Sequence, residues 1–271
     1  MSLLSAQGLT VSFGTTDVVA GIDFEVPAGG TLGIVGESGS GKSMTSLAIM
    51  GLLPASARRS GRIDFDGTDL TSLPERQMRA VRGNRIAMVF QDPLSSLNPY
   101  YTVGTQIAEA YRSHRSGVSR KAARQAAIEA MERVHIKDAG RRVDDYPHQF
   151  SGGMRQRVMI AMALSTEPEL IIADEPTTAL DVTVQAQILD LLAEVRRDTG
   201  AALILITHDL AVVSEVADQL IVMRDGSVVE RGSAERIFSD PQHAYTQALL
   251  DAVPRIDDSI GELRTTTGGP A

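Results

Sequence analysis

The feature that most constrains this chain is the octapeptide GESGSGKS at residues 36–43, which has the spacing G-x-x-x-x-G-K-[ST]. It directly follows an apolar run at residues 31–35 and directly precedes a helical pattern at residues 44–53. A glycine-rich loop between a strand and a helix can wrap its backbone around a phosphate, so that N–H groups and the positive end of the helix dipole face the anion. The sequence therefore predicts a strand–loop–helix unit that binds phosphate, in preference to an ordinary Gly/Ser turn.

Lysine is rare in this chain, which gives weight to the lysine of the loop. Only three of the 271 residues are lysines, at positions 42, 121 and 137. Lys42 is placed to reach the outer phosphates of a nucleotide, and the hydroxyl of Ser43 is placed to ligate Mg²⁺. The residues expected to bind the nucleotide here are Gly36, Ser38, Gly39, Ser40, Gly41, Lys42, Ser43 and Met44.

A pair of carboxylates follows a later apolar run. Residues 170–173 are continuously apolar and lead into Asp174 and Glu175. Because a buried strand normally avoids charge, two carboxylates at its end indicate that something there requires them. Asp174 is placed to hold the water shell of Mg²⁺, and Glu175 is placed to orient and polarise a water for attack on a γ-phosphate. Beside a phosphate loop, this interpretation is favoured over a solvated turn before Pro176.

Hydropathy patterns place these motifs in an α/β fold. Apolar runs without alternation are typical of strands covered on both faces, and they indicate a central parallel sheet. These runs span residues 31–35, 86–90, 170–173 and 203–206. Alternation at residues 22–26 and 63–65 indicates half-buried antiparallel strands. Helical patterns span residues 43–53, 119–134, 182–198 and 210–217. Their order is that of an α/β domain with right-handed crossovers, interrupted by a long insertion that we interpret as a helical subdomain.

Composition excludes several kinds of chemistry. The absence of cysteine excludes disulfides, thiolate zinc sites, cysteine-ligated iron–sulfur clusters and a cysteine nucleophile. A net charge of −8, 4% aromatic residues and no tryptophan argue against a surface for nucleic acid. No apolar run approaches the ~18 residues that cross a bilayer, and residues 1–10 lack the features of a signal peptide. We therefore expect a cytoplasmic protein that does not span a membrane by itself.

A second glycine-rich helix start lies at residues 150–157, with the sequence FSGGMRQR. Ser151 is placed at the helix N-cap and is followed by Gly152 and Gly153, an arrangement that can bind an anion. This segment resembles the signature motif of ATP-binding-cassette (ABC) ATPases. The remaining motifs of that family occur in the family's order, and the resemblance covers about residues 3–254.

Four single residues match further motifs of the family. Gln91 follows the strand that ends at residue 90, as in the Q-loop. Asp181 follows the strand with the two carboxylates, as in the D-loop, and His208 ends the next apolar strand, as in the switch-histidine loop. Phe13 lies where the family places an aromatic ring that stacks on adenine, although a tyrosine is more usual there.

The resemblance implies an ATPase that uses ATP and Mg²⁺. It implies catalytic roles for Glu175, His208, Gln91 and Lys42, and Mg²⁺ contacts for Ser43, Gln91 and Asp174. Cassettes of this family pair head to tail, so that residues 151–153 and Asp181 of one cassette close over the nucleotide of the other. A second helix N-terminus on the open side of the γ-phosphate would add oriented N–H groups in a drier site.

The expected fold is α/β, with a P-loop (RecA-like) parallel sheet core, an N-terminal antiparallel β subdomain and an inserted helical subdomain at about residues 92–165. The nucleotide-binding domain would cover residues 1–254. Residues 255–271 would form a frayed C-terminal tail, because the segment is polar and of low complexity near its end.

Two stretches are similar to one branch of the family, the importer ATPases for oligopeptides, dipeptides and nickel. They are FQDPLSSLNP at residues 90–99 and DPQHAYTQALLDAVP at residues 240–254. Many members of that branch carry a C-terminal cysteine cluster, which this sequence lacks. The resemblance implies a subunit that energises an importer of di- or oligopeptides, and nickel or another small solute is the open alternative.

The same resemblance implies partners and a location. The partners would be integral membrane permease subunits, a second cassette that is a copy or a homologue, and indirectly an extracytoplasmic solute-binding protein. The location would be the cytoplasmic face of the inner (plasma) membrane. Residues 95–105, which include Tyr100 and Tyr101, lie where the family docks a short permease helix, and tyrosines beside a proline-fixed turn suit an interface.

Two rival classes fit less of the sequence. Soluble ABC ATPases that act on ribosomes or DNA usually carry two cassettes or a coiled-coil insertion and meet nucleic acid with a basic surface. This sequence has one cassette, no long heptad run and an acidic balance, so we expect no nucleic-acid partner. A P-loop GTPase or small-molecule kinase would leave the Ser-Gly-Gly segment unexplained, and the sequence has no N-K-x-D segment that reads guanine.

Overall fold

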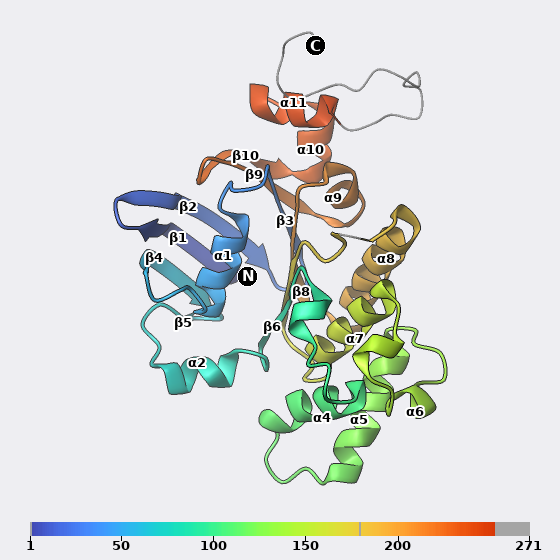
Figure 1. Ribbon diagram of the computed structural model, residues 1–271. Helices are drawn as coiled ribbons and strands as arrows, with labels where there is room; N and C mark the ends of the chain where they lie inside the picture. The colour runs from blue at the N-terminus through green and yellow to red at the C-terminus, as the bar shows by residue number, and fades with distance from the viewer. Residues whose placement is uncertain (1, 179, 253–271) are drawn as a thin grey trace.

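The computed structural model describes residues 2–178 and 180–252, arranged as two sheets with helices packed around them (Figure 1). The expected tail at residues 255–271 lies outside the described residues. None of the helices in the described part of the chain is long and apolar enough to cross a membrane.

The central sheet has the strand order β10-β9-β3-β8-β7-β6. Its strands are β3 (Thr31–Val35), β6 (Ile86–Val89), β7 (Leu170–Asp174), β8 (Ala202–Thr207), β9 (Gln219–Arg224) and β10 (Ser227–Ser233). The pairs β9–β3, β3–β8, β8–β7 and β7–β6 are parallel, and β10 is antiparallel to β9. The predicted parallel core is confirmed, whereas β9 and β10 were not predicted, because the short apolar run at residues 220–223 does not distinguish a strand from other buried segments.

The apolar runs of this sheet have a simple structural cause. Along β8, Leu203 and Leu205 belong to one hydrophobic core, and Ile204 and Ile206 belong to another on the opposite face. Every residue of β8 is therefore buried, as the burial of both sheet faces requires. The sheet lies between the two cores. The loops that follow its parallel strands lie at the carboxyl-terminal edge of the sheet.

The N-terminal sheet is antiparallel and has the order β2-β1-β4-β5. Its strands are β1 (Ser2–Phe13), β2 (Thr16–Pro27), β4 (Ala57–Phe65) and β5 (Thr68–Asp69). Along β2, Ile22, Phe24 and Val26 are buried while the residues between them are exposed. This alternation confirms the predicted half-buried antiparallel strands, and Phe13 ends β1 at the hairpin.

Helices flank the central sheet. They are α1 (Lys42–Met50), α2 (Glu75–Val81), α8 (Val182–Thr199), α9 (Leu210–Val216), α10 (Ala234–Ser239) and α11 (Ala244–Asp251). The helix α1 begins within the phosphate loop and packs in the core beneath the antiparallel sheet, whereas α8 and α9 pack on the other core. Figure 1 places α11 at one end of the molecule, beyond β9 and β10.

A helical subdomain is inserted between β6 and β7, at the end of the molecule opposite α11 (Figure 1). It contains α3 (Pro93–Ser96), α4 (Val103–Ser113), α5 (Arg120–Arg133), α6 (Ala139–Arg142), the 3-10 helix η1 (Pro147–Gln149) and α7 (Gly152–Leu164). Side chains of Thr102, Ser119 and Ser151 cap the N-termini of α4, α5 and α7. The predicted helical insertion is therefore present.

Candidate functional site

A cavity of about 760 Å³ lies where the parallel strands end. We call it the nucleotide cavity. It is lined by Phe13, Val18, Gly36, Glu37, Ser38, Gly39, Gly41, Lys42, Ser43, Met44, Gln91, Glu175, His208 and Leu249. Most of the residues expected to bind nucleotide therefore come together around one space, from the antiparallel sheet, the phosphate loop and the loops after β6, β7 and β8.

The phosphate loop already has the shape of an anion cradle. Gly41 has a φ of 99°, and a Cβ added there would lie 2.4 Å from the Val18 carbonyl oxygen, so this position requires glycine. Gly39 has a φ of 84° and open space beside it. The helix α1 then begins at Lys42 and directs its N-terminus toward the cavity.

Lys42 is held beneath this cradle by backbone oxygens. Its Nζ donates hydrogen bonds to the carbonyls of Gly36 at 2.7 Å and Glu37 at 2.9 Å. Burial lowers the pKa of Lys42, and the nearby carboxylates of Glu175, Asp174 and Glu37 oppose that effect. A phosphate in the cavity would stabilise the charged form of the same ammonium group.

Asp174 lies at the end of β7, directly below the loop. Its carboxylate accepts hydrogen bonds from Ser43 Oγ at 3.1 Å and from Ser46 Oγ at 3.2 Å. Burial raises the pKa of Asp174, and the two serine hydroxyls lower it in opposition. Asp174 does not line the cavity itself, but it is bonded to Ser43, which does. A carboxylate beside a hydroxyl is a donor set that suits Mg²⁺, whose remaining ligands would come from phosphate and water.

The carboxylate of Glu175 contacts side chains from the loops after β6, β7 and β8. Its Oε2 accepts hydrogen bonds from Gln91 Nε2 at 3.0 Å and from Thr178 Oγ1 at 2.9 Å. Its Oε1 lies 3.5 Å from His208 Nδ1. Glu175 also has a φ of 47°, a conformation uncommon for residues other than glycine. The strands β6, β7 and β8 thus deliver an amide, a carboxylate and an imidazole to one point.

Four other candidates lie outside the cavity lining, on the starts of α7 and α8. Ser151 caps α7 by accepting from the Met154 N–H at 3.4 Å, and Gly152 follows it. Asp181 caps α8 by accepting from the Val184 N–H at 3.0 Å. A Cβ at Gly153 would lie 2.4 Å from Val184 Cγ1, so the two helix starts are packed closely together. Together they form one surface, which we call the signature surface.

Ser40 is the remaining phosphate-loop candidate, and it is buried behind the cavity lining. Its Oγ has no hydrogen-bond partner among the described residues. Its carbonyl accepts from the Gly226 N–H at 3.2 Å, which ties the loop to the turn between β9 and β10. In this structure Ser40 therefore supports the loop from behind.

Several residues of the site were not predicted. Val18 and Leu249 line the cavity, and Ser46 and Thr178 bond to the two carboxylates. Ser46 lies one turn of α1 after Ser43, so helical spacing from the motif could have indicated it. Leu249 carried no such signal, because only the tertiary fold brings α11 to the cavity.

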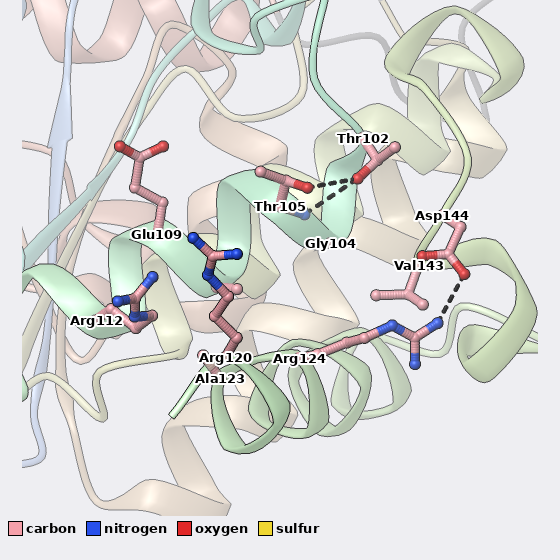
Figure 2. A pocket seen from close by; sticks show the side chains of 11 residues that line it. Thr102, Gly104, Thr105, Glu109, Arg112, Arg120, Ala123, Arg124, Val143 and Asp144 are labelled. Carbon is pink, nitrogen blue, oxygen red and sulfur yellow. Dashed lines mark hydrogen bonds and ion pairs between the residues drawn. The ribbon is translucent and has the colours of Figure 1, made fainter. Parts of the chain in front are cut away.

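A second cavity, of about 480 Å³, lies in the helical subdomain between α4, α5 and the end of α6 (Figure 2). We call it the α4–α5 groove. Its charged side chains are Glu109, Arg112, Arg120, Arg124 and Asp144. Arg124 donates to Asp144 at 2.7 Å, whereas the side chains of Arg112 and Arg120 make no ion pair within the described part of the chain. Glu109 likewise makes no ion pair in this part of the chain, so two unpaired arginines stand against one unpaired glutamate and the balance is positive.

Two tyrosines precede α4, the helix that forms one wall of this groove. Tyr100 is 85% exposed and Tyr101 is 54% exposed. Their turn is ordered by Gln106, whose Nε2 donates to the carbonyls of Asn98 at 2.9 Å and Tyr101 at 3.0 Å. The rings are thus presented to solvent on a fixed backbone.

Comparison with known proteins agrees with this geometry. The ABC transporter family matches residues 19–178, and the oligopeptide/dipeptide transporter C-terminal region matches residues 229–271. The dipeptide transport ATP-binding protein DppD of Bacillus subtilis is 52% identical over 99% of this chain and 82% of its own length. The oligopeptide transport ATP-binding protein OppD of Salmonella typhimurium is 49% identical over 99% of this chain and 81% of its own.

A solved structure gives the same result for the fold. A dimeric ATP-binding cassette in a post-hydrolysis state, bound to ADP and Pi, superposes with a TM-score of 0.76 at 26% identity, covering 85% of this chain and 98% of that one. The fold and site thus define a P-loop ATPase of the cassette type. The chain belongs to the ABC transporter family, and it is an ATP-binding, ATP-hydrolysing subunit of such a transporter.

Proposed function

We propose that this ATPase energises the import of di- or oligopeptides and that its nucleotide site works through the residues gathered around Glu175. The observation that carries the site is the convergence of Gln91, His208 and Glu175 beside the phosphate loop. The choice of solute rests on the similarity to dipeptide and oligopeptide transport ATP-binding proteins.

In this proposal Lys42 binds the outer phosphates of ATP, and Phe13 stacks on adenine at the other end of the cavity. Ser43, Asp174 and Gln91 contact Mg²⁺ or its water shell, a role that their oxygen atoms and their place beside the loop support. Bound Mg²⁺ neutralises negative charge on the phosphates.

Glu175 orients the attacking water as a general base. The hydrogen bonds from Gln91 and Thr178 support this role because they fix the direction of the carboxylate. His208 lies on the other side of the carboxylate, where it can contact the γ-phosphate and the water. A water held between these groups would already be close to the attacking position.

The signature surface serves the nucleotide of another cassette. Ser151, Gly152 and Asp181 line no part of this chain's own cavity, although Ser151 begins an anion-binding helix terminus. The similar cassette solved with ADP and Pi is dimeric. A head-to-tail pair would place the α7 start of each chain on the phosphates held by the other, and the partner is either a second copy or a homologous cassette.

The α4–α5 groove and the two exposed tyrosines form the contact with the permease. Aromatic side chains on a fixed turn bury large area at low entropic cost. Arg112 and Arg120 outnumber the unpaired Glu109 in the groove, and this positive balance favours a permease helix that carries acidic side chains. This contact would hold the chain at the cytoplasmic face of the membrane, with the solute-binding protein reached only through the permease.

The absence of cysteine makes the docking contact easy to test. Thr105→Cys introduces the sole thiol into the groove, and we expect it to cross-link to a permease subunit in membranes that contain the transporter. Glu25→Cys places the thiol on an exposed position of the antiparallel sheet and serves as the matched control. Equal cross-linking from both positions would contradict docking at the groove.

The solute is tested by deleting the gene and measuring uptake. We expect the loss of labelled di- or oligopeptide uptake, with restoration by the wild-type chain but not by Glu175→Gln. Unchanged peptide uptake alongside lost uptake of a nickel complex or another small solute would overturn the substrate assignment. The proposed ATPase site would stand in that case.

A further inference from the structure

The C-terminal helix α11 reaches the phosphate loop. Tyr245, in its first turn, is 7% exposed, and its hydroxyl oxygen accepts a hydrogen bond from the Glu37 backbone N–H at 3.1 Å. Leu249, one turn later, lines the nucleotide cavity. A helix about 200 residues further along the chain is thus in direct contact with the loop expected to bind phosphate.

The hydrogen bond to Tyr245 acts on the peptide group that holds Lys42. The Glu37 N–H and the Gly36 carbonyl belong to one planar peptide group, and in a trans peptide they point in opposite directions. The Gly36 carbonyl accepts from Lys42 Nζ at 2.7 Å. Tyr245 and Lys42 therefore hold the same peptide group from its two ends.

This peptide group needs an external restraint because of the residue that precedes it. Gly36 has a φ of 151°, and a Cβ there would lie 2.1 Å from the Met223 carbonyl oxygen, so the position excludes other residues. Glycine gives the backbone torsional freedom, which leaves the orientation of the carbonyl to its hydrogen-bond partners. A hydroxyl fixed on a buried helix provides such a partner.

Tyr245 is itself held firmly. The guanidinium carbon of Arg224 lies 4.9 Å from the centre of the tyrosine ring. The segment entering α11 is anchored by the buried Glu230 carboxylate, which accepts from the N–H groups of Gln242 at 2.8 Å and His243 at 3.1 Å. His243 Nδ1 in turn accepts from the Tyr245 N–H at 3.1 Å and caps the helix.

The anchor at Glu230 is ionised at neutral pH. Burial alone would raise its pKa, but the hydrogen bonds from the Gln242 and His243 backbones, with the charge of Arg236, help to bring the pKa below its ordinary value. An ionised carboxylate makes stronger hydrogen bonds to backbone N–H groups than a neutral one. The hydrogen bonds to this carboxylate therefore fix the start of α11.

The orientation of the Lys42 ammonium group depends on the Gly36–Glu37 peptide group. An ammonium group has three N–H bonds, and two of them are directed at the Gly36 and Glu37 carbonyls, the acceptors that Lys42 has among the described residues. The direction of the third is then set by the two carbonyls. If the Gly36–Glu37 peptide group rotated, the Gly36 carbonyl would move away from Lys42 Nζ, and the third N–H bond would no longer be directed into the cavity.

We propose that Tyr245 is a positioning residue for ATP binding, which orients Lys42 through the Gly36–Glu37 peptide group and makes α11 part of the nucleotide site. The inference rests on the proposed role of Lys42 in binding phosphate. It assigns a function in the nucleotide site to the C-terminal region, which carries none of the ATPase motifs.

The test is Tyr245→Phe, which retains the ring, its burial and its contact with Arg224. Loss of one hydrogen bond should raise the Kd for ATP by about threefold to tenfold. Turnover at saturating ATP should stay within about twofold, because the groups around Glu175 are untouched. Titration with a fluorescent ATP analogue, calibrated against ATP by competition, gives the stoichiometry and the Kd separately, so that unfolded protein is not mistaken for weak binding.

The matched control is Tyr111→Phe. Tyr111 also lies under an arginine, with Arg115 4.7 Å from its ring centre, and within the described part of the chain its hydroxyl has no hydrogen-bond partner. We expect no change in the Kd for ATP. An equal rise in Kd in both variants would contradict the proposal, because it would show a general effect of removing a tyrosine hydroxyl.

A double-mutant cycle with Lys42→Ala separates positioning from mere packing. If Tyr245 acts through Lys42, then Tyr245→Phe adds nothing to the higher Kd of Lys42→Ala. A further threefold or larger rise in the Lys42→Ala background overturns the inference, as does an unchanged Kd for Tyr245→Phe alone. If Lys42→Ala itself binds ATP as tightly as wild type, the proposed nucleotide site fails and the inference fails with it.

Discussion

At the scale of single residues, Glu175 combines an uncommon backbone conformation with a carboxylate held from three sides. A φ of 47° costs free energy in a residue other than glycine, and such conformations persist where the surrounding structure fixes them. Here the Glu175 N–H donates to the Ile206 carbonyl at 2.8 Å, which ties the strained residue to β8. Glu175 lies directly after β7, and in this conformation its side chain contacts Gln91 and His208.

Replacing this carboxylate should separate ATP binding from hydrolysis. We expect Glu175→Gln to lose turnover by a factor of about 10² or more, because an amide cannot act as the base for the attacking water. Its affinity for ATP should remain near that of the wild type, because Lys42 and the phosphate loop are unchanged. Phosphate release and equilibrium ATP binding, measured on the same preparation, check both parts.

Glu167 provides a matched control for that experiment. It is also a glutamate with positive φ, at 57°, and it lies outside the nucleotide cavity, with its carboxylate 3.8 Å from Arg115 and Arg133. Glu167→Gln should therefore keep normal turnover. Near-normal turnover in Glu175→Gln, or an equal loss in both variants, would remove the assignment of Glu175 as the base.

The sequence located the residues with motif spacing that the structure brings together and missed those that contact them. The carboxylates stood out because charge at the end of a buried strand is unusual. Thr178 was not predicted, although its hydroxyl bonds to Glu175 at 2.9 Å, because a single threonine after a strand has many possible roles. Tyr245 was part of the stretch similar to peptide importers, but no local pattern indicates its contact with Glu37.

At the scale of secondary-structure elements, the position of α4 depends on how closely its first turn approaches the end of α6. The Val103 and Gly104 N–H groups donate to the Asp145 and Val143 carbonyls, both at 2.9 Å. A Cβ on Gly104 would lie 2.4 Å from the Val143 carbonyl oxygen and 2.1 Å from its Cγ2. The wall of the α4–α5 groove is therefore built on a backbone contact that only glycine allows (Figure 2).

Gly104→Ala should destabilise the protein even though alanine is a better helix former. The clash with the Val143 backbone cannot be relieved by a side-chain rotation, so we expect the free energy of unfolding to fall by about 1–3 kcal/mol. Gly140→Ala, in α6 and with no atom within 4 Å of the added Cβ, should leave stability unchanged or slightly raised. Denaturant unfolding compares the two variants, and equal midpoints would show that α4 can shift without cost.

The elements that the sequence predicted are those with a pattern of their own. The apolar runs of β3, β6, β7 and β8 and the long periodic helices α5 and α8 were found, because each carries its signal within the element. The edge strand β10 has no such run: of its residues, Glu230 is buried and serves as the anchor for α11. Its identity as a strand depends on pairing with β9, which the sequence does not encode locally.

At the scale of the whole molecule, the proposed head-to-tail pairing makes the chain two incomplete halves of a site. The nucleotide cavity is lined by the phosphate loop and Glu175, while the signature surface lies on the starts of α7 and α8 and lines no part of that cavity. In the proposed arrangement, a single chain would leave the far side of the γ-phosphate to water. A second cassette would supply the missing helix terminus, so ATP would bind more favourably to the pair than to the separated chains.

Dimerisation should therefore depend on nucleotide. We expect the isolated chain to be mainly monomeric without ATP, and Glu175→Gln to dimerise when ATP is added because it keeps the nucleotide intact. Light scattering with and without ATP measures the change in mass. A mass that stays monomeric with ATP would point to a different cassette as the natural partner, and a dimer whose mass ignores ATP would contradict nucleotide gating.

Gly152→Asp in the Glu175→Gln background tests whether the signature surface makes that contact. A Cβ at Gly152 meets nothing closer than Leu180 Cδ2 at 3.6 Å, so the substitution should be tolerated within one chain. Its carboxylate would face the triphosphate of the partner, and like charges in a dry interface are strongly unfavourable. We expect ATP binding by the monomer to persist while the dimer is lost.

Gly140→Asp is the matched control, because it adds the same charge at another helical glycine with open space. This variant should dimerise normally. If both variants dimerise with ATP, the signature surface is not where the second cassette meets the nucleotide.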